Sequence, residues 1–289
     1  MKKYTLVFFI VLCYHQTFSQ LLSWTPDFAT ESTTLLVITA DATKGNQGLQ
    51  NYTPSDVYVH IGVITSLSSG AGDWKYVKFN QNFNQPNPLL QAVSLGNNKY
   101  SFTITGGLRA YFGMNNPAET IKKIAILFRS GDGTKKLANA DGSDMYIPVY
   151  TNALAVRITN PLSQPSYIPV PETITKVVGD NISVTAVSNL SATLKIYLNG
   201  VEIQTATAAT SISATPTITT GGNQKIIVEA NDGTTTTRDS INFFTTGAVN
   251  VAKLPAGAKD GINYDPNNAA ATLVLYAPGK GRVCVIGEF

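Results

Sequence analysis

Cysteine and histidine are scarce in this chain, and their scarcity excludes several kinds of site. The sequence holds two cysteines and two histidines among 289 residues. Cys13 lies in an N-terminal segment that we expect to be removed, which leaves Cys284 without a second cysteine or a nearby histidine. We therefore expect neither a disulfide framework nor a metal site, and no cofactor. Such a protein must rest on hydrophobic cores, and the chain is long enough to bury them.

Catalytic motifs are missing as well. The sequence has no Gly-x-Ser-x-Gly elbow, no His-Glu-x-x-His, no phosphate loop and no dinucleotide fingerprint. His60 is the one histidine beyond the N-terminal segment and cannot form a Ser-His-Asp unit without such an elbow. A glycosidase needs only two carboxylates, but it also needs a cleft that small sandwich modules do not obviously supply. We expect no catalytic residue within this stretch.

Charge and long apolar runs are also sparse. Charged residues make up 13% of the chain, and no basic run is interleaved with aromatics, which argues against nucleic-acid binding. The apolar run Leu6–Cys13 is far shorter than the ~20 residues of a membrane span. With Lys2 and Lys3 before it and Thr17-Phe18-Ser19 after it, this run predicts a signal peptide over 1–19, cut before Gln20. The protein would then be secreted or held at the cell surface.

Neutral polar residues and β-branched residues dominate what remains. Thr, Ser, Asn and Gly are abundant, and no long helical periodicity occurs. This composition is typical of extracellular all-β modules, in which neutral polar side chains cover the outer faces of sheets. We expect an all-β chain of tandem β-sandwich modules.

The first module is expected over 20–150. Residues 56–63 alternate, with Val57, Val59, Ile61 and Val63 on one face, and the other face is expected to be exposed. Asn116, Pro117 and Glu119 suggest a short helix around 116–122. The predicted strands cover 34–39, 56–63, 74–79, 99–104, 121–129 (expected at the centre of its sheet, from its apolar run) and 145–149.

A proline-rich segment and a second module follow. Residues 151–171 contain four prolines and are expected to form a semi-stiff linker or a first strand. The second module, 172–247, shows short alternating strands and no helix, the pattern of an immunoglobulin-like sandwich. Asn199-Gly200 predicts a type I′ hairpin turn, and Asn231-Asp232-Gly233 a second tight turn. The predicted strands cover 173–178, 181–187, 193–198, 201–207, 224–230 and 237–244.

The last segment, 248–289, predicts the start of a third sandwich. Residues 273–289 show a strand, a Pro-Gly-Lys-Gly turn and a second strand. A lone hairpin is marginal in water, so we expect the rest of a truncated third module, and further domains, to lie downstream in the full protein.

One face of the first module is a candidate carbohydrate site. Tyr58 and His60 are two apart on a predicted strand and should share a face, and Trp74 and Tyr76 repeat that spacing. Flat aromatic rings suit the apolar face of a pyranose, while neighbouring polar groups bind its hydroxyls. The alternative is that these rings cap the core or cover a neighbour.

A second candidate is the loop Asn139-Ala-Asp-Gly-Ser-Asp144. It gathers oxygen ligands, so calcium is conceivable, but it lacks the spacing and the closing glutamate of a helix-loop-helix calcium site. A plain turn entering the last strand is the favoured interpretation.

Five stretches of the first module together resemble a starch-binding sandwich module. They are Asp56-Val-Tyr-Val-His-Ile-Gly, Asp73-Trp-Lys-Tyr-Val, Asn98-Lys-Tyr-Ser-Phe-Thr-Ile, Ile124-Ala-Ile-Leu-Phe-Arg-Ser-Gly-Asp-Gly and Asp144-Met-Tyr-Ile-Pro-Val. The resemblance implies that Tyr58, His60 and Trp74 stack on glucose rings. His60 stands where the family often has another aromatic. Hydrogen bonds to the sugar are expected from Asp56, Asp73 and Arg129, with Tyr76 alongside.

The C-terminal segment resembles the start of the early-set sandwich that precedes the barrel of α-amylase-superfamily enzymes. The residues concerned are Leu273-Val-Leu-Tyr-Ala-Pro and Arg282-Val-Cys-Val-Ile-Gly-Glu-Phe. The order of modules is similar to secreted α-amylase-like proteins of Gram-negative bacteria. It implies an α-glucan polysaccharide as partner and a C-terminal catalytic domain in the same chain, whose barrel carboxylates are not among these residues.

Two other functions fit the same sequence. The modules could be spacers or protein-binding units of an adhesion or structural protein. They could also belong to a surface protein that captures glycans without hydrolysing them. More immunoglobulin-like repeats downstream would favour adhesion, and a barrel with three acidic residues would favour the amylase-type enzyme.

Overall fold

The computed structural model describes residues 20–53, 55–78, 82–246, 253–254, 256–265, 267 and 270–278. The predicted signal peptide lies outside these residues. The chain forms two compact units, Met1–Gly247 and Ala248–Phe289. Strands dominate the described residues, whose helices are one turn each: α1 (Leu108–Phe112) and η2 (Pro88–Leu90). The predicted all-β class is confirmed.

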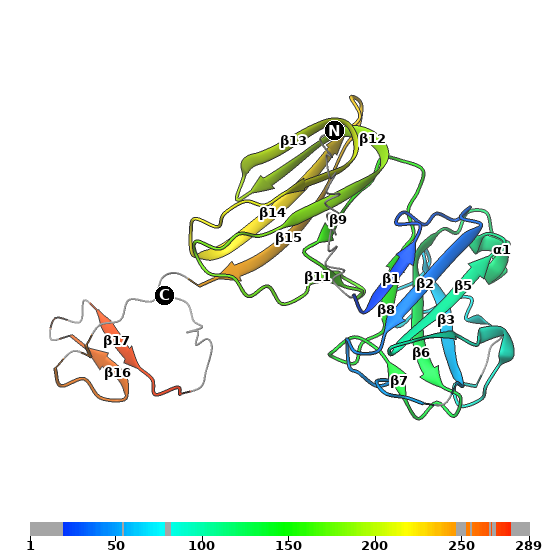
Figure 1. The fold of residues 1–289 in the computed structure, drawn as a ribbon, viewed down its shortest axis with the longest axis horizontal. Helices are drawn as coiled ribbons and strands as arrows, with labels where there is room; N and C mark the ends of the chain where they lie inside the picture. The colour runs from blue at the N-terminus through cyan, green and yellow to red at the C-terminus, as the bar shows by residue number, and fades with distance from the viewer. Residues whose placement is uncertain are drawn as a thin grey trace, which may run out of the picture. The chain divides into compact units, whose positions relative to one another are not determined.

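The first sandwich consists of two antiparallel sheets (Figure 1). In one sheet the strand order is β1-β2-β5-β4, and in the other β6 pairs on one side with β3 and on the other with β7 and β8. The predicted central position of 121–129 therefore agrees with β6. The strands are β1 (Leu22–Thr25), β2 (Leu35–Asp41), β3 (Val57–Thr65), β4 (Val93–Gly96), β5 (Lys99–Thr105), β6 (Ile121–Ser130), β7 (Lys136–Leu137) and β8 (Met145–Pro148).

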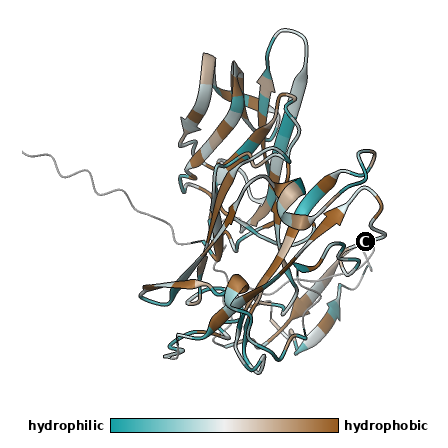
Figure 2. Ribbon diagram, turned by 90° about the vertical axis from the view of Figure 1, so that its right-hand side faces the viewer, coloured by the Kyte–Doolittle hydropathy of each residue, from teal (hydrophilic) through white to brown (hydrophobic). Residues whose placement is uncertain are grey.

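The core between these sheets follows from the period-2 pattern of the strands. Val59 and Ile61 of β3 face Ile126 of β6, Ile38 of β2 and Phe102 of β5 in one buried cluster. Apolar and polar residues alternate along many of the strands (Figure 2). A side chain on β3 that faces away from this cluster points to the outer surface of the sheet, where the candidate site lies.

Two predicted elements of the first sandwich are wrong. Residues 116–122 are not a helix, because the Asn116 side chain accepts a hydrogen bond from the Ala118 amide and closes a turn, and β6 begins at Ile121. The helix is α1, which ends at Gly113 in the left-handed conformation (φ 72°). Residues 74–78 form no strand either; they carry only an isolated antiparallel bridge between Val63 and Lys75.

The second sandwich is built around long strands. β12 pairs with β13 along one edge, while the other edge pairs first with β9 and then with β14. A register shift between Val187 and Ala192 marks a bulge in the β12–β13 pair. Bulges bend a strand, and β12 pairs with β9 before this point and with β14 after it. The strands are β9 (Val156–Asn160), β12 (Val184–Leu198), β13 (Val201–Ala214), β14 (Gly222–Asn231) and β15 (Thr236–Thr245).

This sandwich has its own core, and its immunoglobulin-like class agrees with the prediction. Leu194, Ile196, Ile226, Val228 and Ile241 lie in a buried cluster separate from that of the first sandwich. The predicted strands 181–187 and 193–198 are one strand, β12, and residues 173–178 carry only a bridge between Val177 and Thr246.

The predicted hairpin turn at Asn199-Gly200 is present in this sandwich. Both residues have positive φ (52° and 83°), as a type I′ turn requires, and Leu198 pairs with Val201 across it.

The proline-rich segment contains the first strand of the second sandwich, not only a linker. β9 pairs with β12, and its Ile158 amide donates a 2.8 Å hydrogen bond to the Asp239 carboxylate on β15. The remainder forms a small hairpin of β10 (Ser163–Gln164) and β11 (Val170–Pro171). Prolines confine this hairpin to two pairs of residues, because proline cannot donate to a ladder.

The second compact unit contains one described hairpin. β16 (Gly261–Tyr264) pairs antiparallel with β17 (Ala271–Val274). The predicted first strand from Leu273 overlaps the end of β17, whereas the predicted second strand over Arg282–Phe289 lies outside the described residues.

Candidate functional site

The candidate site lies on the outer face of the β3–β6–β8 sheet. His60 of β3 points to this face and is half-buried opposite Leu127 of β6. Two residues further along β3, and on the same face, Gly62 lies opposite Ala125. Tyr146 of β8 pairs with Ala125 and extends the face. The chain that follows β3 folds back over this face and brings further aromatic rings to it.

Two of those rings enclose the imidazole of His60. The indole of Trp74 stacks on it, with ring centroids 5.4 Å apart and planes inclined by 26°. The ring of Phe83 meets it edge-on at 5.4 Å and 73°. Together with Val77 and Asp144, these residues line a shallow, open groove of about 450 Å³.

Gly62 and a short bridge place Trp74 over the sheet. A Cβ at position 62 would lie 3.1 Å from the Lys75 carbonyl oxygen and 3.4 Å from the Trp74 ring, so glycine allows an approach that a larger residue would push apart. Val63 and Lys75 exchange both backbone hydrogen bonds, at 2.9 and 2.7 Å. The aromatic segment is therefore held by backbone contacts to β3, and Trp74 itself packs on Tyr146 at 6.4 Å.

Asp73 supports the same segment. Its carboxylate accepts hydrogen bonds from the Ser69 amide (2.9 Å) and hydroxyl (3.2 Å) and forms an ion pair with Lys75 (2.8 Å). The hydrogen bond from Lys75 is the main reason why the pKa of Asp73 is lowered. The carboxylate is thus already used to close the loop that leads into Trp74.

The groove pairs the imidazole of His60 with the partly buried carboxyl of Asp144. Burial lowers the pKa of His60, and the nearby Arg129 cation lowers it further. Burial raises the pKa of Asp144, whereas the nearby Lys136 and His60 lower it by a smaller amount. A neutral imidazole ring is the form that stacks well on an indole and can also accept or donate a hydrogen bond at its edge.

Tyr58 and Arg129 are buried, which corrects the expected exposed face at this end of β3. Tyr58 is 8% exposed and Arg129 1% exposed. The guanidinium lies over the rings of Tyr58 (5.6 Å) and Phe83 (5.2 Å) and donates to the carbonyls of Ser130, Gly131 and Gln85. Burial thus leaves Tyr58 little surface for a sugar ring, and Arg129 fixes the loop that carries Phe83.

Tyr76 does not share a face with Trp74. Tyr76 has a positive φ of 50°, and its side chain turns to the main core, where its hydroxyl donates a 2.6 Å hydrogen bond to Glu119. The period-2 expectation fails because this segment is not a regular strand. Asp56 also lies outside the groove lining, and its carboxylate accepts a 2.7 Å hydrogen bond from the Tyr52 hydroxyl.

The loop 139–144 is an internally bonded turn. Asp141 accepts hydrogen bonds from the Ser143 amide (2.9 Å) and hydroxyl (2.6 Å), and Asn139 donates to the Asp144 carbonyl (2.7 Å). Among the described residues, no group of three or more His, Cys, Asp or Glu side chains gathers to hold a metal ion.

Phe83 and Asp144 are groove residues that the sequence pattern does not indicate. Phe83 lies in a polar loop with two prolines, where a lone phenylalanine has no periodicity. In the sequence, Asp144 belongs to the candidate calcium loop and begins one of the stretches that resemble a starch-binding module, but neither pattern indicates it as a groove residue. A signal is nevertheless present, since an aromatic residue in an otherwise polar loop needs an apolar surface to cover.

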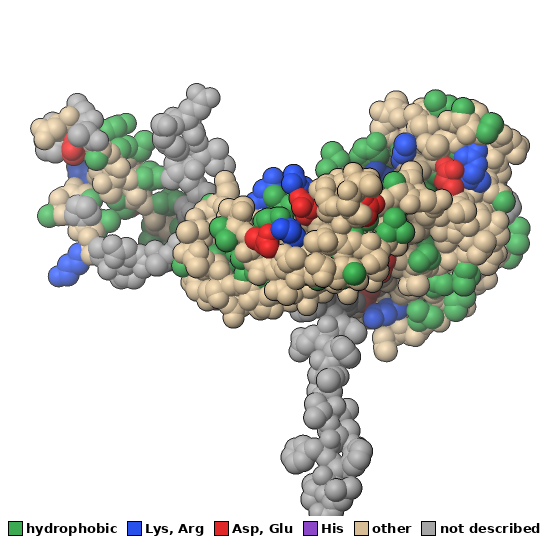
Figure 3. Space-filling model, turned by 90° about the horizontal axis from the view of Figure 1, so that it is seen from above, with side chains coloured by type: hydrophobic (Ala, Val, Ile, Leu, Met, Phe, Trp, Pro, Cys, Tyr) green, Lys and Arg blue, Asp and Glu red, His purple; other side chains and the backbone are tan. Residues whose placement is uncertain are grey.

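Charges are spread thinly over the molecule. On the face seen in Figure 3, acidic and basic side chains are scattered among neutral ones. Within the described part of the chain, no helix is long and apolar enough to cross a membrane.

No family model and no curated protein matches the chain. Similar solved structures include fibronectin(III)-like modules of Clostridium thermocellum CbhA (20% identity, 33% of this chain and 100% of that one, TM-score 0.25). A chimeric titin Z1Z2 is 13% identical, with 80% of this chain and 98% of that one covered and a TM-score of 0.22. The central fibronectin-III array of RIM-binding protein is 12% identical, with 83% of this chain and 72% of that one covered and a TM-score of 0.22. Scores this low carry no argument about function.

Proposed function

We propose that the groove of His60 and Trp74 binds carbohydrate, and that its ligand is an α-glucan such as starch. The observation that carries this proposal is the ring stack of these two residues at the floor of an open groove. The two rings cover each other's facing surfaces, and a ring face left open on the outside of the stack offers a flat apolar platform to the C–H face of a pyranose. Phe83 adds an edge to that platform, and Asp144 and the His60 nitrogens provide hydrogen-bonding groups for hydroxyls.

The shape of the groove favours a polymer over a small buried substrate. Ligand pockets for small molecules enclose most of the ligand surface. This groove is shallow, so a sugar ring would bind on one side only and both neighbouring rings of a chain could continue into solvent. The site is therefore suited to holding a polysaccharide without acting on it.

The wider proposal concerns the whole protein. Such a module would be secreted and joined through the second sandwich to a catalytic domain of the α-amylase type further along the chain. Binding to an insoluble polymer raises the effective concentration of substrate for a tethered domain. The resemblance of the C-terminal segment to an early-set module supports this arrangement, and a glycan-capture protein without catalysis would use the same groove.

One observation favours adhesion as a second candidate. β13 is an edge strand of 14 residues, mostly exposed, and carries no charge from Ile203 to Ala214. Long neutral edges can accept a strand from a partner protein. The bulges in the β12–β13 ladder interrupt this edge, and we therefore rank it second.

Tryptophan fluorescence tests the proposed site directly. The sequence has two tryptophans, so a Trp24→Phe variant reports on Trp74 alone. Titration with maltoheptaose should change this emission with saturation, whereas cellohexaose should not. No change with either sugar would contradict the assignment of Trp74.

A further inference from the structure

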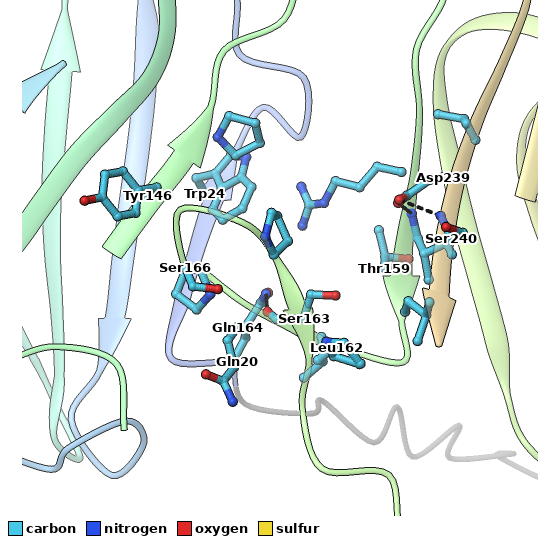
Figure 4. Close-up of a pocket in the computed structure, with 18 of the residues that line it drawn as sticks. Gln20, Trp24, Tyr146, Thr159, Leu162, Ser163, Gln164, Ser166, Asp239 and Ser240 are labelled. Atoms are coloured by element: carbon cyan, nitrogen blue, oxygen red, sulfur yellow. Dashed lines mark hydrogen bonds between the residues drawn. The ribbon is translucent and has the colours of Figure 1, made fainter. Parts of the chain in front are cut away.

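A separate pocket lies within the first compact unit, where the two sandwiches meet (Figure 4). Its volume is about 360 Å³, in the range of small-ligand sites. Trp24 and Tyr146 lie on one side, Asp239 and Ser240 on the other, and the β10–β11 hairpin closes the space between them. Backbone contacts hold this arrangement, since the Tyr146 amide donates to the Pro165 carbonyl at 2.6 Å.

Lys123 is one of the basic residues that line this pocket. It is a half-buried residue of β6 and lines the wall beside Pro148, its register partner on β8. Its ammonium lies 5.3 Å from the Tyr167 ring centroid, and no carboxylate pairs with it among the described residues. Burial lowers the pKa of Lys123. A desolvated ammonium with only an aromatic ring as its partner lacks the anion that usually accompanies it.

The other charges of the pocket are already used. Arg157 lies 4.4 Å over the Trp24 ring and pairs with Asp27 at 3.1 Å. The Asp239 carboxylate accepts from the Ile158 and Ser240 amides, each at 2.8 Å. Arg238 also lines the pocket and pairs with Glu229 at 2.6 Å. Asp239 is held by backbone amides, and Lys123 is the one cation of the lining that has no carboxylate partner among the described residues.

Neutral hydrogen-bonding groups complete the lining. The Ser163 hydroxyl and the Gln164 amide side chain form no hydrogen bond within the described structure, and both lie at the pocket (Figure 4). Tyr150 and Pro148 add apolar surface to the lining. A ligand that matches these groups carries a carboxylate, several hydroxyls and a compact ring.

We propose that this pocket binds a small polyhydroxylated carboxylate of the uronic acid class, with its carboxylate on the Lys123 ammonium and its hydroxyls on Ser163 and Gln164. This site is distinct from the His60–Trp74 groove and does not depend on the function proposed for that groove. A charge-assisted contact of this kind also predicts that binding weakens as salt rises.

Titration calorimetry with sodium glucuronate tests the proposal, with glucose at equal ionic strength as the neutral comparison. The wild-type protein should bind glucuronate with saturation and glucose at least about tenfold more weakly. Lys123→Gln should weaken glucuronate binding by about tenfold or more. Lys122→Gln is the matched control, because Lys122 is the exposed neighbour on β6 and does not line this pocket.

Thermal melts establish that both variants are folded. If Lys123→Gln does not fold, Ser163→Ala together with Gln164→Ala tests the hydroxyl side of the same pocket and should also weaken binding. No saturable binding of glucuronate, or equal binding of glucose, would overturn the proposal. Equal losses in the Lys122 and Lys123 variants would overturn it too.

Discussion

The imidazole of His60 and the indole of Trp74 stack with centroids 5.4 Å apart, although 13 residues separate them in the sequence. His60 comes from a regular strand, and Trp74 from a loop that folds back over it. Two features bring them together: the absence of a side chain at Gly62 and the backbone bridge between Val63 and Lys75. The groove is therefore a product of local backbone geometry, and changes to either ring or to its support should affect it separately.

Replacing Trp74 removes the larger of the two stacked rings. Trp74→Ala should abolish retention on insoluble starch, because stacking is the main contact that the groove offers to a sugar. The half-buried ring also packs on Tyr146, so we expect a loss of roughly 1–3 kcal/mol in the free energy of unfolding. A starch pull-down with parallel urea melts measures both. Trp24→Ala is the control and should retain starch binding; full retention by the Trp74 variant would refute the site.

A methyl group at position 62 should disturb the groove while both stacked rings stay in the sequence. Its Cβ would lie 3.1 Å from the Lys75 carbonyl oxygen and from Val77 Cγ2, so the aromatic segment must shift. Gly62→Ala should cost about 1–3 kcal/mol of stability and weaken starch retention. Gly70→Ala is a matched control, because a methyl group at position 70 would have no atom within 4 Å and the φ of Gly70 is not positive. Equal behaviour of the two variants would show that close packing at Gly62 is unimportant.

Arg129 is expected to act through structure and not through contact with a sugar. Its buried guanidinium satisfies three backbone carbonyls, including that of Gln85 in the loop that carries Phe83. Arg129→Met should lower the free energy of unfolding by roughly 2–4 kcal/mol, since three charge-assisted hydrogen bonds would be lost and the carbonyl of the buried Gly131 would be left without its donor. Arg238→Gln, on an exposed ion pair, should change it by less than about 0.5 kcal/mol. Chemical denaturation of both variants measures these changes. An Arg129 variant that keeps its stability and loses only starch binding would instead favour direct contact between Arg129 and the sugar.

Acidification should destabilise the protein through His60. The pKa of His60 is lowered by burial, so the unfolded chain binds a proton at a higher pH than the folded protein does. This contribution to stability is complete above the unfolded pKa of about 6.5 and is lost as the pH falls below it. His60→Gln should flatten the decline between about pH 6.5 and 5. Urea melts at several pH values measure the slope, and identical slopes in both proteins would contradict the expectation.

Asp144 provides the comparison for that experiment. Burial raises its pKa, so its contribution has the opposite sign: it is lost as the pH rises above the usual value of 3.8. Asp144→Asn should therefore leave the decline at least as steep as in the unmodified protein.

The strands can be predicted from the sequence because their patterns are regular. Alternation over 56–63 and the apolar run over 121–129 correspond to β3 and β6, and Asn199-Gly200 correctly indicates a hairpin. Where strands merge, the prediction is less accurate, since β12 runs through bulges that interrupt the period-2 pattern. The helix predicted around 116–122 is wrong because Asn116 caps a turn as readily as it caps a helix.

The candidate site can be predicted only in part. The sequence indicates both His60 and Trp74, and the structure brings them together. The faces of Tyr58 and Tyr76 do not follow from spacing alone, because one is covered by a returning loop and the other departs from strand geometry with a positive φ. Phe83 and Arg129 pack against residues that are distant in the sequence, and such contacts produce no periodic pattern from which they could be predicted.

Affinity electrophoresis tests the central claim most directly. The purified protein would be run through native gels with soluble starch, with a β-glucan, and with no polysaccharide. We predict retardation in the starch gel alone, which would establish an α-glucan-binding module. Unchanged mobility in both polysaccharide gels would contradict the account, and His60 and Trp74 would then be ordinary covering residues of the sheet.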